Sequence, residues 1–255
     1  MKEMNKKAQI TIFIIIALVI VAAIILFFAI KGNVLSQYFK GKSGELIQIP
    51  PQVEEINTFV FNCIERTGYE AVYIISQHGG YANPPKNSFE FGIPYYYKDG
   101  KSYIPSKNRI EKEISEYINE NIVFCTELFL GFPDFNIIES KMNTTAIIKD
   151  NEVIINTNYP LTINKLNSTF YIKDFKNIKI YTKLGLIYNL SSDIAMDIKN
   201  DNQICLNCII DFSEKYNISV NTFNYGNSTI FVIKDKDFFN NIDNSPYEFK
   251  FAIKP

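Results

Sequence analysis

Hydrophobic and polar positions at the start of the chain form one unbroken apolar run with polar stretches on either side. From Ile10 to Ile30 the only polar side chain belongs to Thr11. At about 1.5 Å per helical residue this run spans roughly 31 Å, close to the hydrocarbon thickness of a bilayer. A buried core helix of that length would show a polar face, and a cleaved secretory signal would have a shorter apolar core ending in small residues. The pattern therefore predicts a retained transmembrane helix over residues 10–30.

The flanks of this run indicate its orientation. Residues 1–9 form a short tail, and residues 31–51 read as a linker containing Gly, Ser and Lys that ends in a Pro-Pro pair. Lysines lie on both sides, so the positive-inside bias is slight. A short tail before the helix and a long domain after it favour a cytoplasmic N-terminus, because long domains translocate largely regardless of charge. We expect a single-pass protein of the cell membrane whose C-terminal domain is extracytoplasmic.

Residues 52–131 show mainly helical spacing, with apolar side chains three or four positions apart. One helix is predicted from Val53 to Ile75, and His78-Gly79-Gly80 ends it. A second follows Ser106, a predicted N-cap, and closes before Gly131-Phe132-Pro133. Between them, residues 89–103 alternate loosely around an Asp-Gly pair, which indicates two short strands and a turn.

Residues 132–255 change to a period of two over most of their length. Strands are predicted at 145–149, 152–157, 168–173, 177–182, 217–223, 228–234 and 247–253, and helices at 184–198 and 201–216. Neither a repeated strand–helix–strand rhythm nor an internal repeat occurs, so antiparallel pairing is favoured over a doubly wound sheet. The predicted fold class is α+β.

The cysteines add a prediction about compartment. All 4 follow the membrane run, which suits a disulfide framework in an oxidising exterior. Cys63 and Cys125 lie on the apolar stripes of two helices and Cys205 and Cys208 are three positions apart, so we predict the pairs Cys63–Cys125 and Cys205–Cys208. The CxxC motif also allows a redox site, because a helix start lowers the pKa of the first thiol. A zinc site would have only Cys63, Cys125 and His78 to complete it. Structural disulfides are the favoured interpretation, with no metal and no cofactor.

Other polar and aromatic residues offer weaker candidates. His78 precedes Gly-Gly-Tyr without a nucleophile motif, so we interpret it as a turn residue and assign no catalytic residue. The carboxylate pairs Glu54-Glu55 and Glu111/Glu113 lie on amphipathic helices and read as solvated faces. The formal net charge of −1 excludes a broad electrostatic attraction to nucleic acid.

Tyr95, Tyr96 and Tyr97 form a possible surface for a glycan or peptide. Because side chains alternate in a strand, at least one of them should face the core. Possible glycosylation acceptors are Asn143, Asn167, Asn217 and Asn227, whereas Asn189 lies in a predicted helix and is the poorest.

The N-terminus resembles the class III signals of archaeal pilin-type proteins, with Lys6-Lys7-Ala8-Gln9 directly before the apolar run. The resemblance implies processing between Ala8 and Gln9 that leaves the helix in place. The chain departs from the pilin pattern, since no acidic residue follows early in the run and glycines and prolines break the helix. A tethered ectodomain fits this better than a filament subunit.

The whole layout is similar to uncharacterised membrane-anchored surface proteins of small-genome archaea. The shared features are the opening Lys7-Ala-Gln-Ile-Thr-Ile-Phe13, Cys63, Gly79-Gly80-Tyr81, Ile93-Pro-Tyr-Tyr96 and Asn151 to Pro160. The resemblance implies topology and fold and no activity.

The leading hypothesis is a non-enzymatic cell-surface protein that acts through contacts with the envelope, a glycan or another protein. The alternatives are a pilin-like assembly subunit and an extracytoplasmic thiol–disulfide enzyme that uses Cys205 and Cys208.

Overall fold

The computed structural model describes residues 50–201, 203–239 and 246–255. The predicted tail with Ala8 and Gln9, the apolar run 10–30 and most of the linker lie outside these ranges. Among the described residues, no helix has the length and hydropathy needed to cross a bilayer. The described residues belong to one structural unit.

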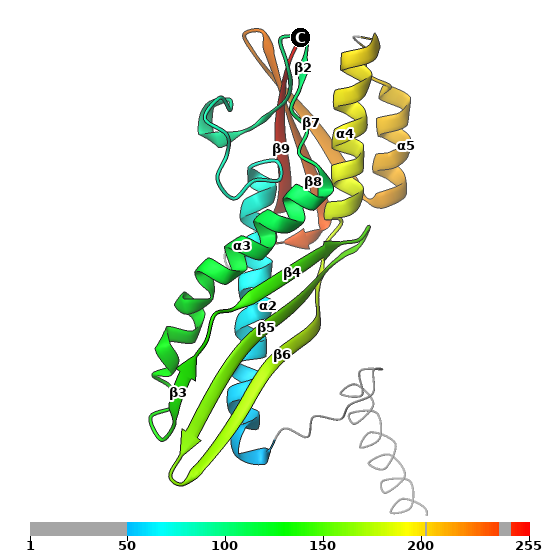
Figure 1. Ribbon diagram of the computed structural model, residues 1–255. Coiled ribbons are helices and arrows are strands. Elements are labelled where there is room, and N and C mark those ends of the chain that lie inside the picture. Colours follow the sequence, from blue (N-terminus) through cyan, green and yellow to red (C-terminus); the bar gives the residue numbers. More distant parts are fainter. Residues whose placement is uncertain (1–49, 202, 240–245) are drawn as a thin grey trace, which may run out of the picture. The chain divides into compact units, whose positions relative to one another are not determined.

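The elements are those of an α+β fold (Figure 1). The helices are η1 Pro51–Val53, α2 Glu54–Gln77, η2 Glu90–Gly92, α3 Lys107–Thr126, η3 Glu127–Phe129, α4 Leu184–Asp201 and α5 Leu206–Tyr216. The strands are β1 Tyr95–Lys98, β2 Lys101–Ser102, β3 Asn136–Glu139, β4 Asn143–Ile148, β5 Glu152–Lys165, β6 Ser168–Tyr181, β7 Ile218–Tyr225, β8 Ser228–Phe239 and β9 Pro246–Lys254. The predicted α+β class is confirmed for this part of the chain.

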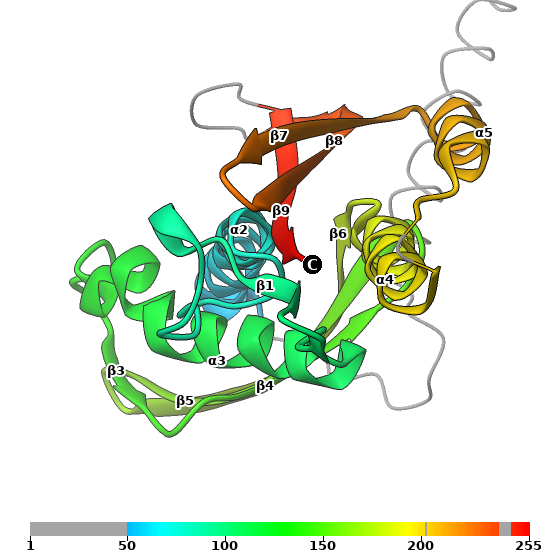
Figure 2. The same ribbon diagram turned by 90° about the horizontal axis from the view of Figure 1, so that it is seen from above.

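Within the described domain, helix α2 lies between the two sheets, as the view along it shows (Figure 2). Its apolar positions are buried at helical spacing, from Ile56 and Val60 through Ile64 to Ile75. Gly68 lets the helix approach the first sheet closely, because a Cβ there would lie only 2.5 Å from the Ile155 side chain. The core is consequently one continuous cluster that joins helices and both sheets.

The first sheet is antiparallel, with β5 paired to β3 and β4 along one edge and to β6 along the other. Helix α3 packs along β4 and accepts hydrogen bonds from two of its backbone N–H groups. Ser115 Oγ accepts from Ala146 N at 3.0 Å, and Glu111 Oε1 accepts from Ile148 N at 2.9 Å. An exposed strand edge invites pairing with other chains, and these side chains block it.

The prediction that Glu111 and Glu113 are solvated is therefore wrong. Glu113 is buried, accepts a hydrogen bond from Ala82 N at 3.0 Å and pairs with Arg109 at 2.5 Å. Helical periodicity could not reveal this, because the backbone donors that hold both carboxylates come from segments distant in sequence. Glu54 and Glu55 are exposed, as expected.

The second sheet has the order β2-β1-β9-β8-β7, and only the β1–β9 pair is parallel. On β9 the predicted alternation holds, since Tyr247, Phe249, Phe251 and Ile253 are all fully buried. Tyr96 of β1 stacks on Phe251 with ring centroids 4.7 Å apart. The helical first part of the chain therefore contributes a strand to the sheet of the second part.

Several predicted boundaries differ from the structure. The strand expected at 152–157 continues to Lys165, and β3 was not predicted. The strands expected at 168–173 and 177–182 are one continuous strand, β6, which shifts register against β5 instead of breaking. Asn177 has a left-handed φ of 61° within it, and its N–H donates to the Asn156 side chain. Helix α5 begins at Leu206 rather than at Asp201, because α4 continues to Asp201 and Cys205 caps the new helix.

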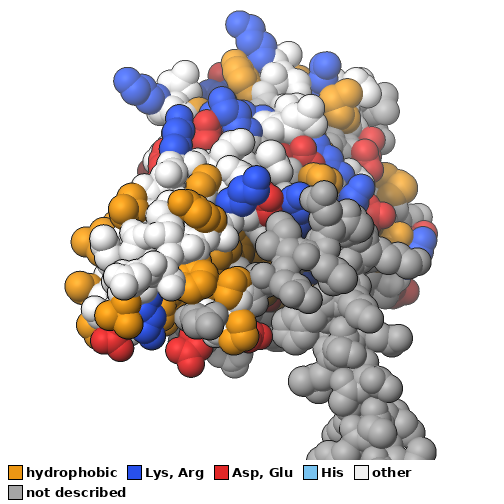
Figure 3. Space-filling view, turned by 60° about the horizontal axis from the view of Figure 1, so that its bottom comes forward, with side chains coloured by type: hydrophobic (Ala, Val, Ile, Leu, Met, Phe, Trp, Pro, Cys, Tyr) orange, Lys and Arg blue, Asp and Glu red, His pale blue; other side chains and the backbone are white. Residues whose placement is uncertain are grey.

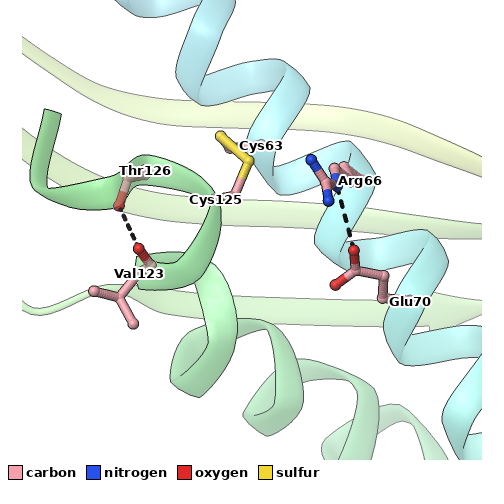
Figure 4. Close-up of a disulfide and its surroundings, with 6 residues drawn as sticks. All are labelled: Cys63, Arg66, Glu70, Val123, Cys125 and Thr126. Carbon is pink, nitrogen blue, oxygen red and sulfur yellow. Dashed lines mark hydrogen bonds and ion pairs between the residues drawn. A yellow bond between two sulfur atoms is a disulfide. The ribbon is translucent and has the colours of Figure 1, made fainter. Parts of the chain in front are cut away.

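Both predicted disulfides are present, and Figure 4 shows the Cys63–Cys125 bridge. Cys63–Cys125 joins the first half of α2 to the last turn of α3, with the two Cα atoms 5.5 Å apart. Beside it, Thr126 Oγ1 donates to the Val123 carbonyl within the same turn. Cys205–Cys208 closes a short loop at the start of α5. The two bridges indicate an oxidising, extracytoplasmic environment for the domain.

Candidate functional site

A cleft of about 430 Å³ opens between the loop that follows α2 and the β1–β2 hairpin. It is lined by three tyrosines, polar side chains of both charge signs and a few apolar groups: Tyr81, Pro85, Asn87, Ser88, Tyr95, Lys98, Asp99, Lys101, Tyr103 and Ile104. The hairpin and the loop lie at the end of the domain that carries the C-terminus, away from the start of α2 (Figure 1). We refer to this site as the tyrosine cleft.

Local sequence explains how the walls of the cleft form. Helix α2 ends because Gly79 and Gly80 adopt φ values of +51° and +98°, which other residues rarely adopt. Gly79 also lies against the backbone of β9, where a Cβ would come within 2.5 Å of the Lys250 carbonyl oxygen. The opposite wall turns at Asp99 and Gly100, both left-handed, as a two-residue hairpin requires.

Tyr95 is held in the cleft by three side-chain contacts. Its hydroxyl lies 3.2 Å from Ser228 Oγ, and its ring meets Phe89 edge-on at 6.3 Å. Lys98 Nζ lies 4.5 Å from the centre of the same ring, within the range of a cation–π interaction. Burial raises the pKa of the Tyr81 hydroxyl, so this group is a neutral hydrogen-bonding group at physiological pH.

The three consecutive tyrosines Tyr95, Tyr96 and Tyr97 lie in different environments. Tyr96 is fully buried and donates its hydroxyl to the Gly79 carbonyl at 2.9 Å, so it is a core residue, as the alternation of a strand required for at least one of them. Tyr97 packs partly buried against the core. Only Tyr95 lines the cleft, where Tyr81 and Tyr103 join it from other segments. Sequence reasoning missed these two, since only the fold of the loop brings them together.

The lining of the cleft carries more positive than negative charge. Asp99 forms an ion pair with Lys254 at 3.0 Å. Lys98 and Lys101 stand on the lining without a carboxylate partner among the described ion pairs. Aromatic faces, an amide, a hydroxyl and two ammonium groups are suited to holding a polar ring compound that carries hydroxyl groups or negative charge.

The CxxC pair lies elsewhere, at the exposed start of α5. Cys205 is the N-cap residue, and its Sγ accepts from Cys208 N at 3.3 Å. Both cysteines are exposed, and so are the apolar side chains of Leu206 and Ile210 close to them. No cluster of three or more His, Cys, Asp or Glu side chains suited to a metal ion occurs among the described residues.

His78 forms the C-cap of α2, so its interpretation as a turn residue is confirmed. Its Nδ1 atom is buried and has no hydrogen-bond partner within the described ranges. Burial, and then the nearby Lys250 ammonium, lowers the pKa of the imidazole. His78 also lines a smaller apolar groove with Phe91 and Phe223, separate from the tyrosine cleft.

The predicted glycosylation acceptors are all exposed but differ in their surroundings. Asn143 starts β4, Asn167 lies in the turn between β5 and β6, and Asn227 lies in the turn between β7 and β8. Asn217 ends α5 in a left-handed conformation, and its amide nitrogen donates to Asp237 at 2.6 Å. That bond occupies the atom to which a glycan would attach, so Asn217 is the poorest of the four acceptors.

The chain matches no family model, no curated protein and no solved structure.

Proposed function

We propose that the chain is a non-enzymatic, membrane-anchored cell-surface protein whose extracytoplasmic domain binds an envelope glycan in the tyrosine cleft. The observation that carries the proposal is the cleft itself, with Tyr81, Tyr95 and Tyr103 on its walls. Lys98 and Lys101 stand beside them and form no ion pair with a carboxylate of the described residues. Tyrosine presents a large apolar face and a hydroxyl at little cost in side-chain entropy, which suits binding of sugar rings.

The anchor is the apolar run 10–30, and the extracytoplasmic placement agrees with the two disulfides. Protease added to spheroplasts should digest the domain after about Lys31 and spare the N-terminal residues. A domain that stays protected until the membrane is lysed would reverse the proposed orientation.

Binding is tested with glycans released from the envelope of the native cell. Tyr103→Ala removes an exposed wall of the cleft and should weaken binding by at least about fivefold, the effect of losing an aromatic anchor. Tyr181→Ala is the matched control, because Tyr181 is similarly exposed but lies on β6. Isothermal titration calorimetry should distinguish the two variants. Equal affinities for Tyr103→Ala and the unchanged protein would exclude the cleft as the binding site.

A second candidate function is favoured by the exposed CxxC pair at the start of an 11-residue helix. A helix N-terminus stabilises a thiolate at the first cysteine. The reaction would be oxidation of a reduced substrate protein. A thiolate of that protein attacks the Cys205–Cys208 disulfide and forms a mixed disulfide. A second substrate thiolate then releases Cys205 and Cys208 as thiols, so the substrate loses two electrons and two protons. Cys205→Ser should abolish oxidation of a reduced test protein, whereas Cys63→Ser should not.

A further inference from the structure

Large hydrophobic side chains are exposed at the end of the domain opposite the tyrosine cleft. Their exposed fractions are 76% for Phe124, 69% for Leu128, 76% for Leu130, 53% for Ile138 and 98% for Leu166. We call these five residues the apolar rim. They come from the last turn of α3, from η3 and the residue after it, from β3, and from the β5–β6 turn. Exposure of several large apolar residues at one end marks an interaction surface.

The fold holds these side chains outward. Phe129 and Phe132 point inward and pack edge-on against Phe59 of α2, with centroid distances of 6.1 and 5.2 Å. Leu128 and Leu130 flank Phe129 in the chain and are left on the outside. The turn between them is unusual, because Glu127, Leu128 and Phe129 all have positive φ. Such a conformation is unfavourable for residues with a Cβ, and packing of Phe129 on α2 offsets it.

Leu166, in the turn between β5 and β6, is also held outward by an unfavourable backbone conformation. It adopts a φ of 52° in a turn where Asn, Asp or Gly is usual, and almost all of its side chain is in solvent. Neither backbone preference nor core packing accounts for a leucine there. An apolar environment outside the domain would account for this leucine.

The rim lies at the end where the chain enters the domain. Figure 1 shows the start of α2, the β5–β6 turn, β3 and the end of α3 together at the lower end. The contact of Phe59 with Phe129 and the Cys63–Cys125 bridge fix this proximity. Residues 31–49 connect this end to the apolar run 10–30. At roughly 3.4 Å per residue, they allow at most about 65 Å of separation.

The charge distribution indicates how the rim would make contact. Between residues 123 and 138 the only charged side chains are Glu127 and Asp134. One ammonium stands beside them, since Lys165 next to Leu166 lies with its Nζ 4.4 Å from the centre of the Phe135 ring. In Figure 3, which brings the lower end forward, hydrophobic side chains gather on the left of the face and Lys and Arg lie mainly in its upper part. Contact would therefore depend on apolar insertion and not on attraction to anionic headgroups.

We infer that the apolar rim inserts into the lipid interface of the membrane that residues 10–30 cross, so that the domain stands with its tyrosine cleft facing away from the bilayer. The inference rests on the proposed membrane anchor. Apolar side chains of this kind are favourable at the boundary between headgroups and acyl chains. The other possible occupant, a second copy of the chain, would have no need to lie at the end where the anchor joins.

Because the chain contains no Trp, a single Trp provides a specific probe. The full chain carrying Leu128→Trp or Leu166→Trp is reconstituted into phosphatidylcholine vesicles, with or without bromine on the acyl chains. We expect blue-shifted emission and at least about twofold quenching by the brominated lipid. Tyr225→Trp is the control, since Tyr225 is exposed in the remote β7–β8 hairpin and should not be quenched. Leu128 and Leu166 lie on different elements, so one variant serves if the other fails to fold.

Each outcome has a separate meaning. If the protein floats with the vesicles but its rim Trp is quenched no more than the control Trp, the inference is overturned and the anchor stays intact. Protein that does not float with vesicles would instead overturn the membrane anchor. A blue shift that depends on protein concentration and is insensitive to bromine would show that a second copy covers the rim, which also overturns the inference. Adding Leu130→Asp to Leu166→Trp should reduce the quenching.

Discussion

At the scale of single residues, the role of a side chain depends on which face its element presents. Tyr95 and Tyr96 are adjacent in sequence, yet one lines a cleft and the other lies in the core with its hydroxyl on the Gly79 carbonyl. Glu113 belongs to a typical amphipathic helix but is buried against the Ala82 N–H. Such polar groups are tolerated in the interior because each has a partner.

Loss of the buried hydroxyl of Tyr96 should destabilise the domain. In Tyr96→Phe the ring still stacks on Phe251, but the Gly79 carbonyl loses its buried donor. We expect the free energy of unfolding to fall by about 1–3 kcal/mol. Urea unfolding followed by circular dichroism measures it. Tyr171→Phe, at a tyrosine 74% exposed, should change stability by less than about 0.5 kcal/mol, and equal effects would contradict the argument.

His78 should titrate below its usual range, because burial and Lys250 disfavour the imidazolium and lower its pKa. It is the only histidine, so its ring signals in NMR need no assignment. We expect a pKa below about 6.5. The unfolded chain then takes up the proton at higher pH than the folded chain, so stability falls as pH drops through about 6.5. His78→Gln should remove this slope, and titration at or above 6.5 would refute the prediction.

At the scale of elements, stability depends on how helices are fixed to strands. Helix α3 is bound on one side to α2 by Cys63–Cys125 and on the other to the edge of β4 by Ser115 and Glu111. These two side chains are four positions apart and therefore lie on one face of the helix. They replace the neighbouring strand that β4 lacks.

Removal of one edge contact should be measurable. In Ser115→Ala the Ala146 N–H loses its acceptor in a buried position. We expect destabilisation of about 1–3 kcal/mol in urea unfolding. Glu116→Ala, which removes a partner of the exposed Lys112 pair one residue along the helix, should cost less than about 1 kcal/mol. A larger effect of Glu116→Ala would show that β4 does not depend on the edge contact.

The two disulfides should contribute unequally. The Cys63–Cys125 bridge joins residues 62 apart and the Cys205–Cys208 bridge residues 3 apart. In the chain-entropy model the long loop is worth about 4 kcal/mol and the short one about 2 kcal/mol. Paired Cys→Ser variants compared by thermal unfolding should show the larger loss for the long loop. An equal or reversed order would contradict this account.

At the scale of the whole molecule, ion pairs join segments that are far apart in sequence. Lys183, just before α4, contacts Asp235 at 2.8 Å and Asp237 at 2.5 Å on β8. Glu248 of β9 pairs with Lys234 at 2.6 Å and with Lys250 at 2.8 Å. Burial opposes ionisation of Glu248, but the hydrogen bonds that Lys234 and Lys250 donate to it prevail, so its pKa is lowered overall. The hydrogen bonds from Lys183 and Asn217 lower that of Asp237.

These contacts predict loss of stability in acid. Both carboxyl groups hold their protons less tightly in the folded chain than in the unfolded chain. Their contribution is therefore complete above about pH 4.3 and is lost as the pH falls below that value. Urea unfolding between pH 5 and pH 3 should show the decline, and Glu248→Gln should make it shallower. An unchanged slope in Glu248→Gln would exclude Glu248 as a contributor.

Much of the local structure could be predicted because it depends on near neighbours. The periodicity of α2, the Ser106 cap of α3, the alternation on β9 and the Cys63–Cys125 pair agree with the structure. The single strand β6 was missed, since the stretch around Asn177 resembles a turn and is held in the sheet by Asn156. Partners on another strand cannot be inferred from local pattern.

The amino-acid sequence alone determined the apolar run, the α+β class and the cysteine framework, because these follow from hydrophobic period and residue type. Only the tertiary structure decided the parallel β1–β9 pair, the burial of Glu113 and the meeting of Tyr81, Tyr95 and Tyr103 in one cleft. It also decided that the end of α3 and the β5–β6 turn lie at the end of the domain where the chain enters it, with Leu128 in η3 directly after α3 and Leu166 in the turn. Each of these depends on contacts between segments distant in the chain, and the physical reason is that such contacts are selected by the packing of the whole core.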